Sequence, residues 1–217
     1  SFALIYAETF SWSLTYQLMA FLMALNILVT VYISSEQSNP DLAILNYKQS
    51  LLEPTKDFLE RFGLKIASIL ILIIATYRLT DIVMGPMANP FYIDMGYSLS
   101  EIGYVVKIVA LIATIIGVFI GGIFVKRLGL YKSLLIGASL VMFTNLSFSY
   151  ASINEKNLVM LASIVASDSL AAGIVGTVNI TFLTSLVSSK YTGFQYALLT
   201  SLMAFLGKLF GGFSGVF

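Results

Sequence analysis

Six long apolar stretches divide this chain, and they restrict its possible folds more than any other feature of the sequence. A segment that crosses the hydrocarbon core of a bilayer needs about 20 mostly apolar residues, and a helix satisfies its backbone groups internally. The sequence therefore predicts an all-α, polytopic membrane protein with about six transmembrane helices. The expected spans are Trp12–Ile33, Leu64–Pro86, Gly103–Phe124, Lys132–Tyr150, Leu158–Val187 and Phe194–Phe217.

Composition agrees with this class and excludes several others. Hydrophobic residues make up 58% of the chain and charged residues 11%, whereas about a quarter of the residues of a soluble domain are charged. The net charge of +1 provides no field for nucleic acid, so we expect no nucleic-acid partner. Cysteine and histidine are both absent, which removes the usual ligands and bases of many enzymes. We expect no enzymatic activity and no metal or organic cofactor.

The basic residues of the connecting segments predict an orientation, because Lys and Arg favour the cytoplasmic side of short loops. One side of the predicted bundle collects most of them, whereas the other side carries only Lys156 beside several acids. The segment 34–63 is therefore expected to be a long central cytoplasmic loop, with a short surface helix after Pro54. The basic residues of the cytoplasmic side are Lys48, Lys56, Arg61, Lys65, Lys126, Arg127, Lys132 and Lys190.

Charged side chains also fall inside the predicted spans, where an unpaired charge costs roughly 2.5–3.5 kcal/mol on insertion scales. Arg78 stands ~21 Å along its helix from Leu64, too deep for a boundary residue. Asp81 follows three positions later on the same face. The two form either an ion pair that joins helices or a contact for an anionic solute or a proton. Lys107 lies only ~6 Å into its span, so it either reaches the outer interface or joins this pair.

Asp168 lies ~15 Å into its span, close to the midplane, with no basic residue one turn away on the same helix. It is either a hydrogen-bonded structural acid or the proton-carrying acid of a coupled carrier. Lys208, deep in the last span, is a candidate partner for it. Ala113, Gly117 and Gly121 repeat every fourth residue, which predicts close helix packing or a sliding gate.

One stretch of the sequence resembles a motif of a known superfamily. The segment 121–133 is similar to a degenerate copy of the basic cytoplasmic loop of the major facilitator superfamily, without the aspartate that usually precedes the basic residues. The resemblance implies the last helix of an N-terminal half in 1–33, the central loop in 34–63, and an incomplete C-terminal half in 64–217. The gating-loop candidates that it implies are Gly122, Lys126, Arg127 and Lys132.

A narrower resemblance runs from about Arg61 to the end of the chain. The segments that carry it are Tyr77–Asp81, Pro90–Ser98, Val106–Lys107, Lys190–Thr192 and Gln195–Leu202. They resemble the AmpG muropeptide permeases, which import anhydro-muropeptides for cell-wall recycling and are thought to be driven by protons. The chain departs from that pattern at Asp168-Ser169 and at Gly193-Phe194.

The resemblance implies part of a proton-coupled carrier in the bacterial inner membrane. Its expected partners are an anhydro-muropeptide or related anionic small molecule, protons, the lipid bilayer and a missing N-terminal half. The chain begins at Ser1 without an initiator methionine, so we expect it either to start inside a longer protein or to be a processed or truncated product. The substrate-binding candidates are Arg78, Lys107, Tyr77, Gln195 and Lys208, and the proton-coupling candidates are Asp81 and Asp168.

Three alternatives stay open. The first is a facilitator for another anionic solute, such as a coenzyme A ester or a nucleotide. The second is an intramembrane enzyme with Asp81 and Asp168 as an aspartyl dyad, although neither acid has the sequence context of the intramembrane aspartyl proteases. The third is the inactive product of a split or decaying gene.

Overall fold

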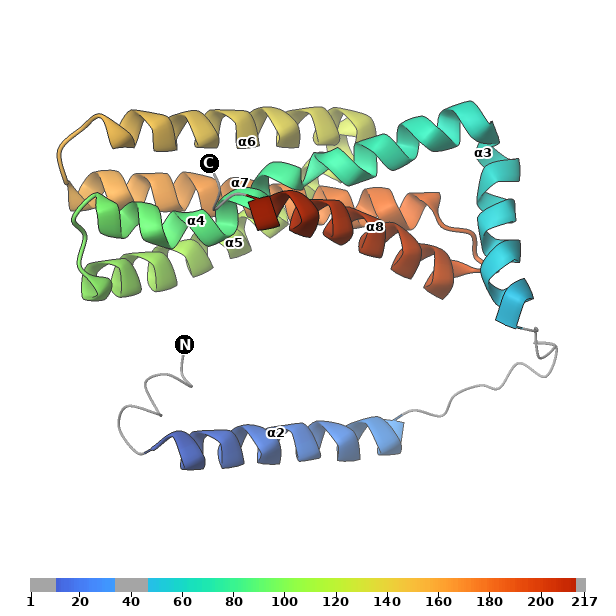
Figure 1. Ribbon diagram of the computed structural model, residues 1–217, viewed down its shortest axis with the longest axis horizontal. Coiled ribbons are helices and arrows are strands. Elements are labelled where there is room, and N and C mark those ends of the chain that lie inside the picture. The colour runs from blue at the N-terminus through green and yellow to red at the C-terminus, as the bar shows by residue number, and fades with distance from the viewer. Residues whose placement is uncertain (1–10, 34–46, 214–217) are drawn as a thin grey trace. The chain divides into compact units, whose positions relative to one another are not determined.

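The computed structural model describes residues 11–33 and 47–213, and every regular element in this part of the chain is a helix (Figure 1). The chain divides into two compact units, residues 1–46 and 47–217. The first unit contains α2 (Trp12–Ile33), which carries no charged residue. Its apolar residues are distributed around the whole circumference of the helix. A helix that is apolar all round is typical of a membrane span. The all-α prediction is confirmed for the described residues.

The second unit contributes most of the membrane-spanning length. Within the described ranges, six helical segments are long and apolar enough to cross a membrane, counting α3 and α4 together, so the predicted number of spans is confirmed. The helices of this unit are α3 (Tyr47–Tyr77), α4 (Leu79–Asp94), α5 (Leu99–Leu128), α6 (Leu130–Ser152), α7 (Leu158–Leu186) and α8 (Thr192–Phe213).

Most predicted boundaries differ from the structure by four residues or fewer, and two regions differ by more. The predicted span Leu64–Pro86 is interrupted at Arg78, where the backbone leaves the helical region, and its second part continues as α4 to Asp94. The surface helix expected after Pro54 already begins at Tyr47 and is merged with the following span across a kink at Gly63. Gly63 has φ 70°, a left-handed value that favours glycine. The segment 34–46 of the predicted loop lies outside the described residues.

Helix α7 is the centre of the second unit. It packs most extensively against α5 and then against α6, whereas α8 packs across α3 and α4 (Figure 1). Most of its middle turns are buried, including Ile174, Val175 and Val178. The unit therefore consists of one layer of α5, α7 and α6 and a second layer of α3, α4 and α8.

Small residues allow α5 and α7 to approach closely. A Cβ atom added at Gly117 would collide with the Leu170 carbonyl oxygen, and one added at Gly173 would collide with the Thr114 carbonyl oxygen. At Gly121 the added atom would lie 2.9 Å from the Ile174 carbonyl oxygen. The glycine stripe expected from the sequence is therefore a packing surface in this structure. Glycine allows such backbone approach because it has no side chain.

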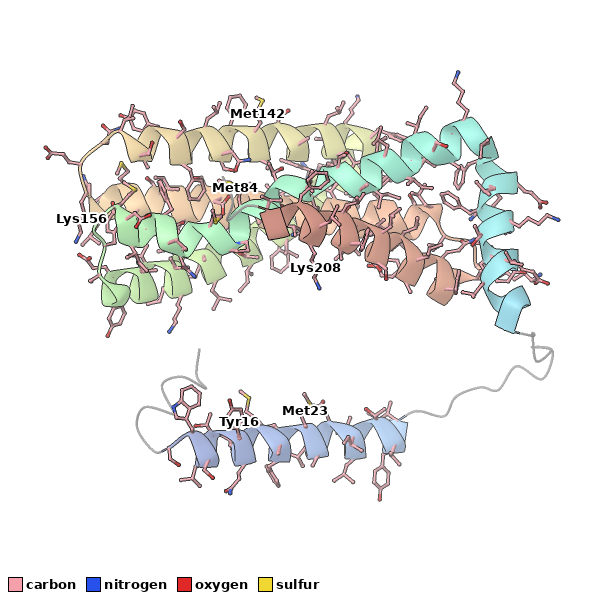
Figure 2. All side chains as sticks on the ribbon, viewed as in Figure 1. Tyr16, Met23, Met84, Met142, Lys156 and Lys208 are labelled. Carbon is pink, nitrogen blue, oxygen red and sulfur yellow. The ribbon has the colours of Figure 1, made fainter. Side chains whose placement is uncertain are left out.

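The bundle has two ends that differ in chemistry. The Lys156 end, defined by the turns 95–98 and 153–157, lies at the left of Figure 2. Lys156 Nζ lies 2.9 Å from Glu101 Oε2, and the Tyr97 hydroxyl donates a hydrogen bond of 2.9 Å to the Asn157 carbonyl oxygen. Ser98 and Glu101 form a capping box that begins α5. These contacts tie the two turns together.

The Lys190 end, defined by the α5–α6 junction at Gly129 and the turn 187–191, lies opposite. Gly129 has φ 83° and joins α5 directly to α6. Hydrogen bonding to Tyr191 raises the pKa of Lys190 further above neutral pH, where a lysine side chain is already charged. The exposed side chains of Lys126 and Arg127 lie at the same end, in the last turn of α5. This end is therefore the positively charged one.

A glycine pair on α7 tests the packing account. We expect Gly173→Ala to lower the stability of the folded chain by roughly 1–3 kcal/mol, because the new methyl group overpacks the contact with α5. Gly176→Ala, one turn along the same helix, is the matched control, since nothing lies within 4 Å of its added atom. Thermal unfolding in detergent measures both, and equal midpoints for the two variants would contradict the close approach.

Candidate functional site

Arg78 occupies the junction between α3 and α4. Its torsions, φ −109° and ψ 11°, are not helical, so α3 ends at Tyr77 and α4 begins at Leu79. Asp81 lies in the first turn of α4, where the positive end of the helix dipole favours a carboxylate. Arg78 Nε is 3.6 Å from Asp81 Oδ2, so the two side chains form the ion pair that their spacing predicts.

This ion pair leaves hydrogen-bonding capacity unused. Arg78 Nε and Asp81 Oδ2 are both buried, and neither atom has a hydrogen-bond partner among the described residues. The two side chains nevertheless keep 33% and 21% of their surface exposed. Buried polar atoms in proteins are almost always bonded to something. The pair is therefore suited to a further partner such as water, a proton or a solute.

A cavity of about 640 Å³ lies between α4 and the pair of helices α6 and α7. Arg78 and Asp81 line it from α4, and Asp168 lines it from the middle of α7. The structure thus brings Asp168 to the same cavity as Arg78 and Asp81, which lie on a different predicted span.

Some lining residues were missed by the sequence analysis as site candidates. Asn145, Ser149 and Ser152 line the cavity from α6, and Asp94 lines it from the last turn of α4. The three α6 residues are separated by four and three positions, as expected for one face of a helix. That polar spacing within an apolar span was the available signal. Asp94 lies between the predicted spans Leu64–Pro86 and Gly103–Phe124 and was therefore expected in a connecting segment.

A second cavity of about 580 Å³ lies against α3, α4 and α6 and shares Asn145 with the first. Tyr77 and Thr80 line it, and the Tyr77 hydroxyl donates a hydrogen bond of 3.2 Å to the Leu134 carbonyl oxygen. Tyr77 therefore lies beside the charged cavity, separated from it by the wall that contains Asn145. Neither charged pair member lines this second space.

Two predicted lysine contacts are absent. Lys107 and Lys208 are both exposed, neither lines the charged cavity, and neither belongs to an ion pair within the described residues. Figure 2 shows Lys208 extending away from the helices. The expected partnership of Lys208 with Asp168 and the expected cluster of Lys107 with Arg78 are therefore not formed. A rotation of each helix about its axis, which depth along the helix does not fix, accounts for the difference.

Gln195 lies elsewhere as well, near the Lys190 end. Its side chain is 2% exposed and hydrogen-bonded to α3 and to the α7–α8 turn, so it does not face the charged cavity. The gating-loop candidates Lys126, Arg127 and Lys132 are exposed around the α5–α6 junction, and none of them forms an ion pair with a described residue. Gly122 is exposed on α5 with open space beside it.

The charge balance of the cavity favours an anion only when at least one of its acids is protonated. Among its described lining residues it has one cationic side chain, Arg78, and three carboxylates, Asp81, Asp94 and Asp168. In a medium of low dielectric constant, like charges repel strongly, so an anion beside Arg78 is favoured when a neighbouring acid carries a proton. Aromatic side chains close one wall, with the Phe91 and Phe148 ring centroids 5.8 Å apart.

A helical bundle with an ionisable cavity inside its spans is the architecture of a membrane transporter. Residues 1–212 match the family model described as Major Facilitator Superfamily, and the chain belongs to that superfamily. Its members are transporters, and this chain is accordingly a multi-pass membrane protein of the transporter class and not an enzyme.

The relatives place the chain more narrowly. The chain is 30% identical to the anhydromuropeptide permease of Escherichia coli (strain K12) over 202 residues, which are 93% of this chain and 40% of that protein. It is 28% identical over 195 residues to the putative transporter AmpG 4 of Rickettsia conorii, covering 88% of this chain and 46% of that protein. The resemblance to AmpG permeases is confirmed. The chain spans less than half the length of these two curated relatives.

The Arg78–Asp81 pair can be tested as a unit. We expect Arg78→Met and Asp81→Leu each to lower the free energy of unfolding by roughly 1–3 kcal/mol, because each leaves one charge without its partner in an apolar span. The double variant should recover most of that loss, since it leaves no charge behind. Thermal unfolding of the four proteins in detergent gives the double-mutant cycle, and additive losses in the double variant would show that the two charges do not interact.

Proposed function

We propose that this chain is the C-terminal part of a proton-coupled carrier that imports anhydro-muropeptides across the bacterial inner membrane for cell-wall recycling. The observation that carries the proposal is the presence of Arg78, Asp81 and Asp168 on the wall of one cavity. The name of the E. coli relative supports the substrate class. Because the chain covers 40–46% of the two relatives, a second half of the carrier is part of the proposal.

The roles follow from charge. Arg78 binds a carboxylate of the muramyl or peptide part of the solute, and Asp81 competes for the same guanidinium group. Protonation of Asp81 or Asp168 removes a repelling negative charge, so the solute and the proton favour each other's binding. Release of the proton on the other side restores the Arg78–Asp81 pair and weakens the hold on the solute. Lys107 and Lys208 lie outside the cavity and are proposed to attract the anion on its approach.

The orientation is part of the same proposal. The Lys190 end carries the basic α5–α6 junction, whereas the Lys156 end pairs its lysine with Glu101. Positive residues in short loops are retained in the cytoplasm. The Lys190 end is therefore cytoplasmic and the charged cavity opens nearer the periplasmic side, where the muropeptide is generated. Tyr77 and Asn145 then lie farther along the path, beside the second cavity.

Uptake of radiolabelled anhydro-muropeptide tests the function. Cells lacking their own permease would express this chain alone or together with any coding sequence that precedes it in frame. We expect uptake only from the longer product, because half of the solute site is otherwise missing, and we expect an uncoupler to abolish it. Absence of uptake, with the product shown to be in the membrane, would contradict the substrate assignment. Uptake of a coenzyme A ester instead would favour the other anionic solute.

The role of Asp168 can be separated from binding. We expect Asp168→Asn to abolish accumulation against a gradient while equilibrium exchange of labelled solute continues, because the amide cannot carry the coupled proton. Glu155→Gln, an exposed acid in the turn before α7, is the matched control and should accumulate normally. Both reactions are measured in the same vesicles with an imposed pH gradient. Normal accumulation by Asp168→Asn would show that another group carries the proton.

A further inference from the structure

Gln195 has every hydrogen-bonding position of its side chain occupied. Its oxygen Oε1 accepts from the Ser188 backbone N–H at 2.6 Å and from Arg61 Nη2 at 3.1 Å. Its nitrogen Nε2 donates to the Pro54 carbonyl oxygen at 2.8 Å and to Asp57 Oδ2 at 2.9 Å. A neutral amide has two acceptor and two donor positions, so this side chain has none left for a solute.

The partners of Gln195 come from two segments that are far apart in sequence. Pro54, Asp57 and Arg61 belong to the first part of α3, and Ser188 belongs to the turn between α7 and α8. Arg61 extends the contact, since it also donates from Nη2 to the Leu186 carbonyl oxygen at 3.1 Å.

A second contact joins the same two segments. The Tyr191 hydroxyl donates a hydrogen bond of 3.0 Å to Glu53 Oε2. Phe58, which is 6% exposed, belongs to the same apolar cluster as Leu186 and Leu199. Polar and apolar contacts therefore both hold the first part of α3 against the end of α7 and the start of α8.

The first part of α3 needs such contacts because its direction is not fixed by the helix that follows. Residues 47–62, here called the linker helix, run across the Lys190 end of the bundle, at a steep angle to the rest of α3 (Figure 1). Gly63, with φ 70° and ψ 155°, separates the two parts. A glycine in this conformation has many alternatives open to it, so the angle at the kink depends on what the linker helix touches.

We propose that Gln195 is a positioning residue that locks the linker helix to the α7–α8 turn, and that it does not contact the transported solute. The lock attaches the linker helix to the end of α7 at Leu186. The same helix carries Asp168, which lies ~27 Å from Leu186 along the helix axis. Its effect on transport rests on the proposed function: a movement of the linker helix is transmitted along α7 to Asp168, the proposed proton carrier. The lock itself exists whatever the solute is.

Limited proteolysis tests the lock without any solute. Trypsin is added to the membrane-embedded protein from the side of the Lys190 end, and cleavage after Lys56 and Arg61 is compared with cleavage after Arg127. We expect Gln195→Leu to raise the rate at the two linker sites about tenfold, because four hydrogen bonds are lost. Cleavage after Arg127 should stay within twofold. Ser189→Ala, in the same turn, is the matched control and should leave all three rates unchanged.

A second variant removes the linker side of the contact. Asp57→Ala leaves α8 intact, and we expect it to expose the same two sites by a smaller factor. If Gln195→Leu raises the cleavage rate equally at all three sites, the variant has unfolded. The cleavage pattern of Asp57→Ala then decides whether the lock exists. Unchanged cleavage in Asp57→Ala, or an equal rise at Arg127 in both variants, would overturn the proposal.

Transport kinetics separate positioning from solute contact. In the longer product that takes up anhydro-muropeptide, we expect Gln195→Leu to lower Vmax at least tenfold with KM within twofold of the wild-type value. A raised KM with unchanged Vmax would assign Gln195 to the solute and overturn the proposal. A wild-type protein without uptake would defeat the proposed function, and the proteolysis result would still decide whether the lock exists.

Discussion

The cost of placing charge in hydrocarbon is the constraint on which the rest of this structure depends. Arg78 and Asp81 interrupt one of the most apolar runs of the chain, and they do so where α3 ends and α4 begins. Two apolar residues would pack there without that cost, so the presence of the charged pair indicates a polar cavity inside the bundle. That space is the charged cavity, and Asp168 reaches it from α7. Its described lining places one cation, Arg78, among three acids.

Close packing of α5 and α7 gives the cavity its fixed wall. Gly117 and Gly173 bring the two backbones together so closely that no side chain fits between them. Helix α7 is thereby held in the middle of its layer, and the position of Asp168 is set by packing rather than by an ion pair of its own. The same helix ends at Leu186 beside the linker helix. Helix α7 therefore connects Asp168 with the linker helix.

Depth and spacing along a helix were readable from the sequence, whereas rotation and long-range partners were not. The ion pair follows from an i,i+3 spacing, and the midplane depth of Asp168 made it a candidate before its surroundings were known. The exposure of Lys107 and Lys208 depends on how each helix is turned toward its neighbours. The partners of Gln195 on α3 are Arg61, Asp57 and Pro54, which lie 134, 138 and 141 positions away, and no local sequence pattern predicts them. The break at Arg78 was hidden because its flanks are strongly apolar.

We propose that the charged cavity holds water and receives the solute, and the absence of cysteine from the chain allows a direct test of this proposal. Ala172 lines the cavity on α7, and Phe119 is 70% exposed on α5 outside it. A single cysteine would be placed at each position in the longer, transport-active product and treated with a charged, water-soluble thiol reagent. We expect Ala172→Cys to react rapidly and anhydro-muropeptide to slow that reaction. Phe119→Cys should react slowly, at a rate that anhydro-muropeptide does not change. An unreactive Ala172→Cys, or a reaction rate that anhydro-muropeptide does not change, would contradict this proposal.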